Sequence, residues 1–187
     1  MNGSLYLFPQ DPFAAPAPEP VLACLEALEL AGEPLAEAPG KRVLAAGPGF
    51  AREVAFAGCS PHLRFAPAAE GDRDFCHLAL IGPLSRPLLL TGPRTAKPRC
   101  PACRARIADW RKRIEDAESR LDCPDCGASL QAATLDWRQQ AAVGRLLIEL
   151  RNVFPGEATP SDRLLAALAE TGGGTWTFAW AGMSPLP

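Results

Sequence analysis

Cys100-Pro101-Ala102-Cys103 and Cys123-Pro124-Asp125-Cys126 are the stretches that decide how the middle of this chain folds. A Cys-x-x-Cys turn points two sulfur atoms at one place, and two such turns supply the four soft ligands that a tetrahedral zinc ion prefers. The spacing therefore predicts one Zn²⁺ bound by Cys100, Cys103, Cys123 and Cys126. Because four protein ligands leave no open position for a substrate, we expect this zinc to be structural.

The two cysteine pairs differ in the residue that follows them. Cys123-Pro-Asp-Cys126-Gly127 resembles a zinc knuckle, in which glycine permits the positive φ of a tight turn, whereas Arg104 stands at that position after the first pair. Over about residues 98–130 the chain resembles zinc-ribbon and rubredoxin-like modules, and no family is recognised over the rest. Iron uses the same four ligands, and Cys-Pro-x-Cys also occurs in thiol redox sites, so both remain alternatives to zinc.

The insert between the two pairs shows a helical pattern. Its apolar residues recur at steps of three and four, which is helical spacing. The two pairs must meet at one ion, so a rise of about 1.5 Å per residue limits the helix to roughly three turns. We therefore expect a helix near 106–117 and a short return, with this apolar stripe: Ile107, Trp110, Ile114, Ala117 and Leu121.

Composition restricts the class of protein. The 187 residues, 48% hydrophobic and 21% charged, are typical of a globular chain that buries a core. No secretory signal and no membrane-length apolar run is visible, and the abundance of Ala, Arg, Pro and Leu is typical of a GC-rich bacterial genome. Seven cysteines with four in metal-type pairs indicate free or metal-bound thiols, so we expect a cytoplasmic protein without a disulfide framework.

The rest of the chain predicts an α+β fold: a small mixed or antiparallel sheet with two main helices, carrying the four-cysteine ribbon and its helical insert. We expect an N-terminal α+β region over 1–93, the zinc-binding module over 94–130, and a C-terminal strand–helix–strand region over 131–187 that packs with the first. The expected elements are an edge strand at 5–8, a helix at 20–31, three to five short strands within 41–92, a strand at 143–153, a helix through 164–168 and a strand at 175–180.

A basic cluster accompanies the first cysteine pair. Residues 94–113 carry eight basic side chains against Asp109 alone, in a protein of net charge −2. Such a surface suits an acidic protein or a phosphate backbone, although Arg111–Glu115 and Lys112–Asp116 at i,i+4 would neutralise part of it. The candidate partner-binding residues are Arg99, Arg104, Arg106, Arg111, Lys112 and Arg113.

Two tryptophans are candidates for docking the module onto the rest of the protein. Trp110 lies on the apolar stripe and is expected to pack inward. Asp136-Trp137-Arg138 follows the module, with Trp137 as a possible anchor and Arg138 as a possible partner of an acidic side chain.

Weaker patterns offer a second metal site, a Cys–His dyad or a nucleotide loop. Cys59 and His62 have ligand spacing, but neighbours such as Cys76 and His77 point to opposite faces of a strand. Gly47-Pro48-Gly49 follows an apolar run as a phosphate loop would, but it lacks a third glycine and its proline removes an amide donor.

These observations favour a cytosolic, non-enzymatic adaptor or interaction protein with a structural zinc. We expect its macromolecular partner to be a protein ahead of nucleic acid, and no membrane. The alternatives are a nucleic-acid-associated zinc-ribbon protein that uses the 94–113 cluster, and a small enzyme or thiol redox sensor.

Overall fold

The computed structural model describes residues 3–57, 63–69, 72, 74–153 and 156–182. Its main body is a six-stranded sheet in the order β12-β1-β10-β5-β3-β2, and every pair of neighbours is antiparallel. The expected α+β class is therefore confirmed, with a wholly antiparallel sheet. The strands of this sheet are β1 (Gly3–Pro9), β2 (Ala31–Ala38), β3 (Lys41–Ala46), β5 (His77–Ile81), β10 (Leu147–Val153) and β12 (Trp176–Ala181).

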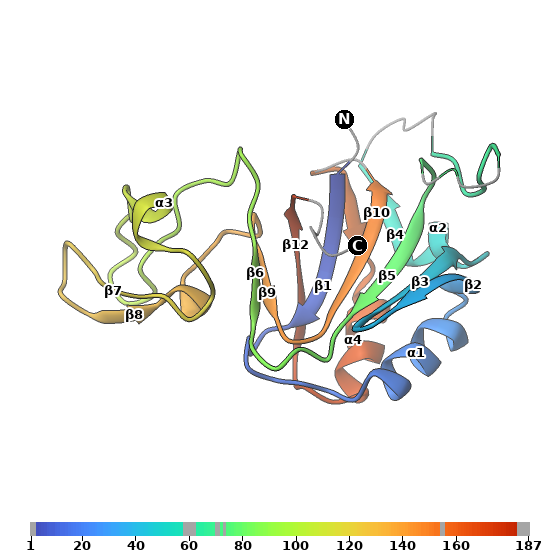
Figure 1. Cartoon of the computed structure of the whole chain (residues 1–187), viewed down its shortest axis with the longest axis horizontal. Coiled ribbons are helices and arrows are strands. Elements are labelled where there is room, and N and C mark those ends of the chain that lie inside the picture. The colour runs from blue at the N-terminus through green and yellow to red at the C-terminus, as the bar shows by residue number, and fades with distance from the viewer. Residues whose placement is uncertain (1–2, 58–62, 70–71, 73, 154–155, 183–187) are drawn as a thin grey trace.

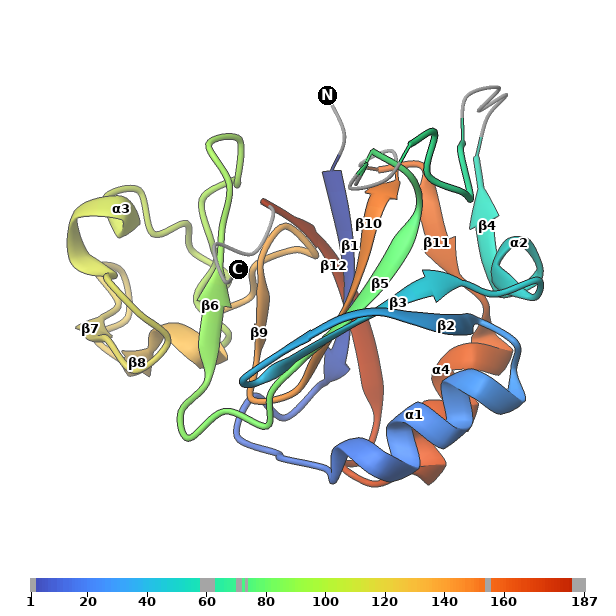
Figure 2. The same cartoon turned by 45° about the vertical axis from the view of Figure 1, so that its right-hand side comes forward.

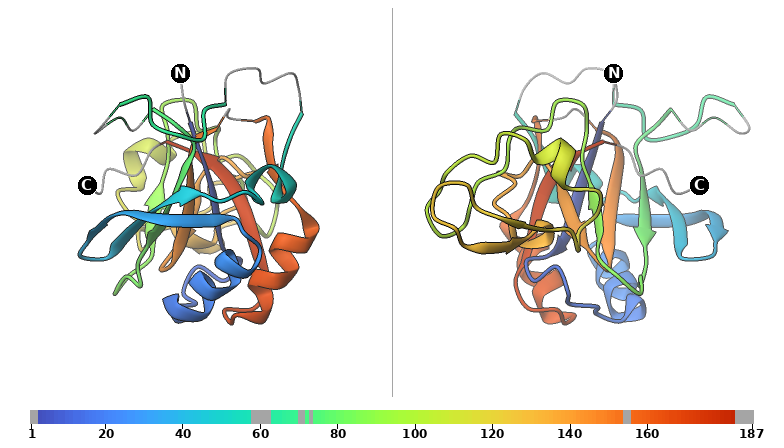
Figure 3. Two further views of the ribbon diagram at one scale, coloured as in Figure 1. Left: turned by 90° about the vertical axis from the view of Figure 1, so that its right-hand side faces the viewer. Right: turned by 60° about the vertical axis from the view of Figure 1, so that its left-hand side comes forward.

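Two main helices cover one face of the sheet, α1 (Pro18–Ala27) and α4 (Asp162–Glu170), and they lie side by side below it (Figure 1 and the left view of Figure 3). Alternate strand residues such as Leu5 and Ile148 face these helices and form the largest buried cluster. Ser161 caps α4, because its hydroxyl accepts a hydrogen bond from the Leu164 amide at 3.0 Å.

The opposite face of the sheet is also buried. Tyr6, Leu147 and Ala179 lie there with Leu90 and Ala142 of a short ribbon, β6 (Leu88–Leu90) paired with β9 (Ala142–Gly144). β1 pairs with both β12 and β10, so it is a central strand and does not lie at the edge where we expected it. A continuous apolar run is typical of a strand covered on both sides.

The expected strand at 143–153 is divided into β9 and β10. Arg145 lies between the two strands, and its Nε donates a hydrogen bond to the Leu84 carbonyl at 2.8 Å. The shorter elements outside the large sheet are α2 (Phe50–Glu53), β4 (Val54–Phe56), β11 (Ala158–Pro160), β7 (Arg120–Asp122), β8 (Ser129–Gln131), a 3-10 turn (Ala132–Thr134) and α3 (Trp110–Arg113), with β4 paired to β11 and β7 to β8.

Residues 91–141 project from the body beyond the β6–β9 ribbon, as Figures 1 and 2 show. Leu90 pairs with Ala142, so the chain leaves and re-enters the body at neighbouring points. We call residues 91–141 the cysteine module. It has its own hydrophobic cluster, separate from the two clusters of the body.

The expected helix over 106–117 is wrong in length: α3 is a single turn that ends before Ile114, whose backbone is extended. Asp116 and Ser119 form a hydrogen-bonded turn after it, and the chain then enters β7. All five residues of the apolar stripe are nevertheless at most 8% exposed and belong to one cluster. The 3–4 spacing thus identified the buried side chains but not their backbone conformation.

Among the described residues, no helix has both the length and the apolar character that crossing a membrane requires.

Candidate metal centre

The four predicted ligands meet in the cysteine module. The Sγ atoms of Cys100, Cys103, Cys123 and Cys126 all lie within 4.8 Å of one another, with 3.9 Å from Cys100 to Cys126 and 3.6 Å from Cys103 to Cys123. Metal–sulfur bonds of about 2.3 Å in a tetrahedron place sulfur atoms about 3.8 Å apart. A disulfide would bring two of them to about 2.05 Å. The cluster therefore has the dimensions of a site that could hold one metal ion.

Both cysteine turns have the same backbone hydrogen bonds. In each, the first cysteine donates its amide to the carbonyl five residues later, at 2.8 and 2.9 Å, and the residue after the second cysteine donates back to the first, at 2.9 and 3.0 Å. That returning residue has φ of +66° at Arg104 and +71° at Gly127. The first turn thus adopts the glycine conformation despite its arginine, at a steric cost of about 1 kcal/mol.

The cluster lies at the surface of the module. Cys100 and Cys123 are buried against Ile107 and Trp110, whereas Cys103 and Cys126 are exposed. Four thiolates from the chain would complete a tetrahedral shell, so such a site supports a structural metal and leaves no position for a substrate.

Backbone hydrogen bonds lower the pKa values of both Cys123 and Cys103, whereas the neighbouring sulfurs lower that of Cys123 and raise that of Cys103. Hydrogen bonds from backbone amides, that of Cys126 first, lower the pKa of Cys123 to about 7. A backbone hydrogen bond with Ala105 is the largest influence on Cys103 and lowers its pKa, but burial and the other three thiols together raise it to about 12. Amides that point at sulfur favour the thiolate, which is the form that binds metal.

Trp110 and Trp137 form the centre of the module's own cluster. Their rings meet edge to face at 5.1 Å, and the Trp137 Nε1–H donates to the Ala132 carbonyl at 2.9 Å. Trp137 also lines a groove of about 250 Å³ towards Phe178 of β12, together with the exposed Arg138. The expectation that these residues dock the module onto the body stays a prediction.

Three of the candidate partner-binding arginines are used inside the molecule. The Arg111 guanidinium stacks 4.2 Å from the Trp110 ring centroid and donates to three main-chain carbonyls at 3.0–3.3 Å. Arg104 pairs with Asp136 at 3.0 Å. Arg113 donates to the Asp122 carbonyl at 3.0 Å and lies 3.5 Å from the carboxylate of Asp109.

The other candidates differ from these three. Arg99 exchanges two backbone hydrogen bonds with Asp136, and its Nε is buried without a hydrogen-bond partner among the described residues. Arg106 and Lys112 are exposed, and no acidic partner is recorded for either in the described part of the chain. The expected pairs of Arg111 with Glu115 and of Lys112 with Asp116 do not form.

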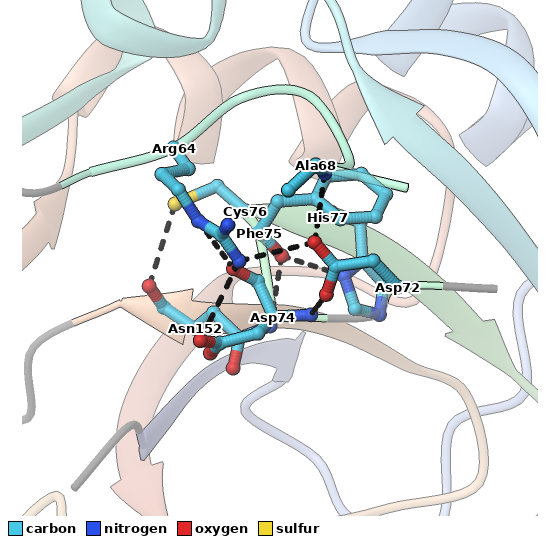
Figure 4. A network of polar contacts seen from close by, with 8 residues as sticks. All are labelled: Arg64, Ala68, Asp72, Asp74, Phe75, Cys76, His77 and Asn152. Atoms are coloured by element: carbon cyan, nitrogen blue, oxygen red, sulfur yellow. Dashed lines mark hydrogen bonds and ion pairs between the residues drawn. The ribbon is translucent and has the colours of Figure 1, made fainter. Parts of the chain in front are cut away.

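The weaker cysteine and histidine patterns do not make a site among the described residues. Cys76 faces the helices and His77 the opposite side of the sheet, as their alternation required. Figure 4 shows the Cys76 thiol donating to the Asn152 carbonyl at 3.4 Å, while His77 Nδ1 lies 2.8 Å from the Phe75 carbonyl oxygen. Burial raises the pKa of Cys76 to about 11, which keeps it a thiol. Cys59 and His62 lie outside the described residues.

Gly47-Pro48-Gly49 lies against the carboxyl end of α1 and does not form a phosphate loop. The Gly47 and Gly49 amides donate to the carbonyls of Leu30 and Glu29 at 2.9 Å. A Cβ at Gly47 would lie 2.2 Å from the Glu29 oxygen, so glycine is needed for this close approach. A helix carboxyl end repels the negative charge that a phosphate loop must attract.

One buried polar cluster was not predicted. Glu149 is fully buried, and its Oε1 accepts hydrogen bonds from the Tyr6 hydroxyl at 2.7 Å and the Ser4 hydroxyl at 2.9 Å. Arg151 forms an ion pair with its Oε2 at 2.9 Å. Sequence alternation alone would place Glu149 and Arg151 on a solvent-facing side of the strand. The signal for them in the sequence is the pair Ser4 and Tyr6, at the same spacing on β1.

Comparison of the whole chain with protein families, with curated proteins and with solved structures found no match. The cysteine module itself is therefore the basis for assigning a function.

Proposed function

We propose that this protein is a zinc-stabilised interaction protein. One structural Zn²⁺ held by the four cysteines folds a zinc-ribbon-like module, and the module presents a basic surface to another protein in the cytosol. The observation that supports this most is the convergence of four sulfur atoms within 4.8 Å from two turns of the same geometry. The closed ligand set favours a role other than catalysis.

The body and the module are proposed to be separate folding units. The sequence suggested a zinc module over 94–130 between regions 1–93 and 131–187. The module's hydrophobic cluster includes Leu135, Trp137 and Ala141, which supports extending the unit to 91–141. Metal binding would supply on the order of 10 kcal/mol to this small unit.

A protein partner is proposed ahead of nucleic acid. Single-stranded nucleic acid binds through exposed aromatic platforms, and duplex binding requires a long basic stripe. The exposed large apolar side chains among the described residues are Phe13 and Phe65, both outside the module. Acidic side chains also interrupt the basic surface on the same module: Glu115, Asp116, Glu118, Asp122 and Asp125.

Metal analysis of the untagged protein tests the proposal. We expect one zinc ion per chain, four thiols that become titratable after chelation, and no colour of iron. After chelation, hydrogen exchange should become fast at the Arg104 and Gly127 amides while β1 and β10 stay protected. Metal-free protein with redox-active Cys-Pro-x-Cys pairs would contradict the proposal and favour a thiol redox sensor.

A further inference from the structure

We propose that the module binds an acidic peptide segment of its partner in a pocket beside α3, through Arg94, Lys97 and Lys112. The inference depends on the proposed function, because it names the partner's chemistry and the place where the partner binds. Of these three residues, only Lys112 is among the candidate partner-binding residues that the sequence predicted.

The pocket has a volume of about 460 Å³ and lies between residues 93–97 and residues 108–112. Arg94, Lys97 and Lys112 are exposed around it, and in the described part of the chain none of them has an acidic partner. The one carboxylate in the lining, Asp109, lies 3.5 Å from Arg113. Three cations thus face a concave surface whose only acid is already paired.

Arg111 and Trp110 give this pocket a fixed frame. Arg111 stacks on Trp110 and donates to the carbonyls of Gly92, Pro93 and Thr95, which ties one wall of the pocket to the other. The Thr95 hydroxyl donates to the Gln140 carbonyl at 3.0 Å and holds the same loop from its other side. Arg111 therefore holds the walls of the pocket together through its Nη2 atom.

The shape and charge of the pocket favour carboxylates on a peptide over nucleic acid. Trp110 is 5% exposed and lies under Arg111, so it offers no face on which a base could stack. Part of the lining is apolar, with Pro93, Ala96 and Ala108 among the cations. A short peptide segment that carries both acidic and apolar side chains matches this mixture. The positively charged area is too small to contact many phosphates at once.

The pocket should also depend on the metal. Trp110, which lies beneath Arg111, packs in the same cluster as Cys100 and Cys123. Loss of the metal would loosen this cluster and the two walls that Arg111 connects. By reciprocity, a bound peptide should slow the removal of metal by a chelator.

The test is fluorescence anisotropy of labelled deca-glutamate with the full-length protein. The Lys97→Glu/Lys112→Glu variant should bind about tenfold more weakly or worse, because like charges then face the peptide. The matched control is Arg106→Glu/Arg120→Glu, which reverses two exposed cations of the same module outside the pocket and likewise takes the net charge from −2 to −6. We expect the control to weaken binding less than about threefold, because screening limits distant charges. The neutral Lys97→Gln/Lys112→Gln variant should be intermediate.

Three results would overturn the inference: no binding of deca-glutamate to the native protein, equal weakening by the pocket and control variants, or tighter binding of labelled deca-thymidylate that the pocket variant abolishes. The last result would replace the peptide by nucleic acid. Metal content is measured on each sample. Full zinc occupancy without peptide binding would overturn the proposed peptide site but not the proposed zinc-stabilised module. Binding by a metal-free protein that the pocket variant weakens would contradict the proposed zinc and support the peptide site.

Discussion

At the scale of single residues, the two cysteine turns show how a backbone can impose a conformation on an unsuitable side chain. Arg104 and Gly127 hold the same positive φ and make the same hydrogen bond. Glycine at Gly127 meets no steric barrier in this region, whereas arginine at position 104 does. The ion pair of Arg104 with Asp136 offsets only a small part of this steric cost, because the Arg104 side chain is exposed to solvent.

Gly127→Ala should destabilise the module by about 1–2 kcal/mol, since a Cβ there has open space around it but the wrong backbone conformation. The opposite substitution tests the strain at position 104. Arg104→Gly should be about 1 kcal/mol more stable than Arg104→Ala, because both variants lose the ion pair with Asp136 and only glycine relieves the backbone strain. Urea unfolding of the metal-loaded proteins measures both differences. Equal stability of the two Arg104 variants would show that this position carries no strain.

Cys76 should make the stability of the body depend on pH in the alkaline range. Burial raises its pKa from 9.0 to about 11, so the folded state holds the thiol proton more tightly than the unfolded chain does. This contribution is fully present below pH 9.0 and is lost as the pH rises towards 11. The native protein should therefore lose more stability over that range than Cys76→Ala, as urea unfolding at a series of pH values would reveal. Parallel curves for the two proteins would refute this role.

Residue types were sufficient to predict that the four cysteines gather in one cluster, because two Cys-x-x-Cys turns at this spacing can meet at one point. They were not sufficient to predict which arginines are free. Arg111 and Arg113 are occupied by main-chain carbonyls, and carbonyl positions depend on a loop path that no local pattern encodes. Arg94, which has no acidic partner among the described residues, is the same residue type as Arg111 and Arg113 and differs from them only in position.

At the scale of elements, periodicity was a better guide to burial than to conformation. The stripe from Ile107 to Leu121 is buried as predicted, but α3 is one turn long. A rigid helix would have carried the chain away from the second cysteine turn, and a turn at Asp116–Ser119 reverses it sooner. The starts of α1 and α4 were predicted well because proline and serine begin them, but the expected helix end at 31 was wrong, since α1 ends at Ala27 and β2 begins at Ala31. β1 was misplaced because partners distant in sequence decide whether a strand lies at an edge.

Trp137 should stabilise the module through both its ring and its N–H group. Trp137→Phe removes the hydrogen bond to Ala132 and should cost about 1 kcal/mol, whereas Trp137→Ala should cost about 3–5 kcal/mol. Both costs should appear as weaker retention of metal against a competing chelator, because Trp137 packs in the same cluster as Cys100. Phe13→Ala, an exposed aromatic outside the module, serves as the control. Unchanged metal retention in Trp137→Ala would mean that the cluster and the metal are not coupled.

At the scale of the whole molecule, the body has a core of its own. Neither of its two hydrophobic clusters includes a residue from 92–140. Leu90 and Ala142 are paired, so an Asn-Gly turn between Thr91 and Ala141 could close β6 and β9 into a hairpin. The protein with 92–140 replaced by Asn-Gly should keep its sheet and unfold cooperatively, as circular dichroism during heating would show. Loss of the sheet would mean that the module is an integral part of the core.

The strand order of the sheet has a consequence for how the chain is made. β1 is synthesised before the other strands of the sheet, yet both of its neighbours, β10 and β12, are synthesised after the last residue of the module. The module closes over a short stretch of chain, whereas the centre of the sheet joins distant segments, and short loops close sooner. A nascent chain that has reached Gly144 therefore already contains all four cysteines of the candidate metal centre, whereas neither strand that pairs with β1 has yet been synthesised.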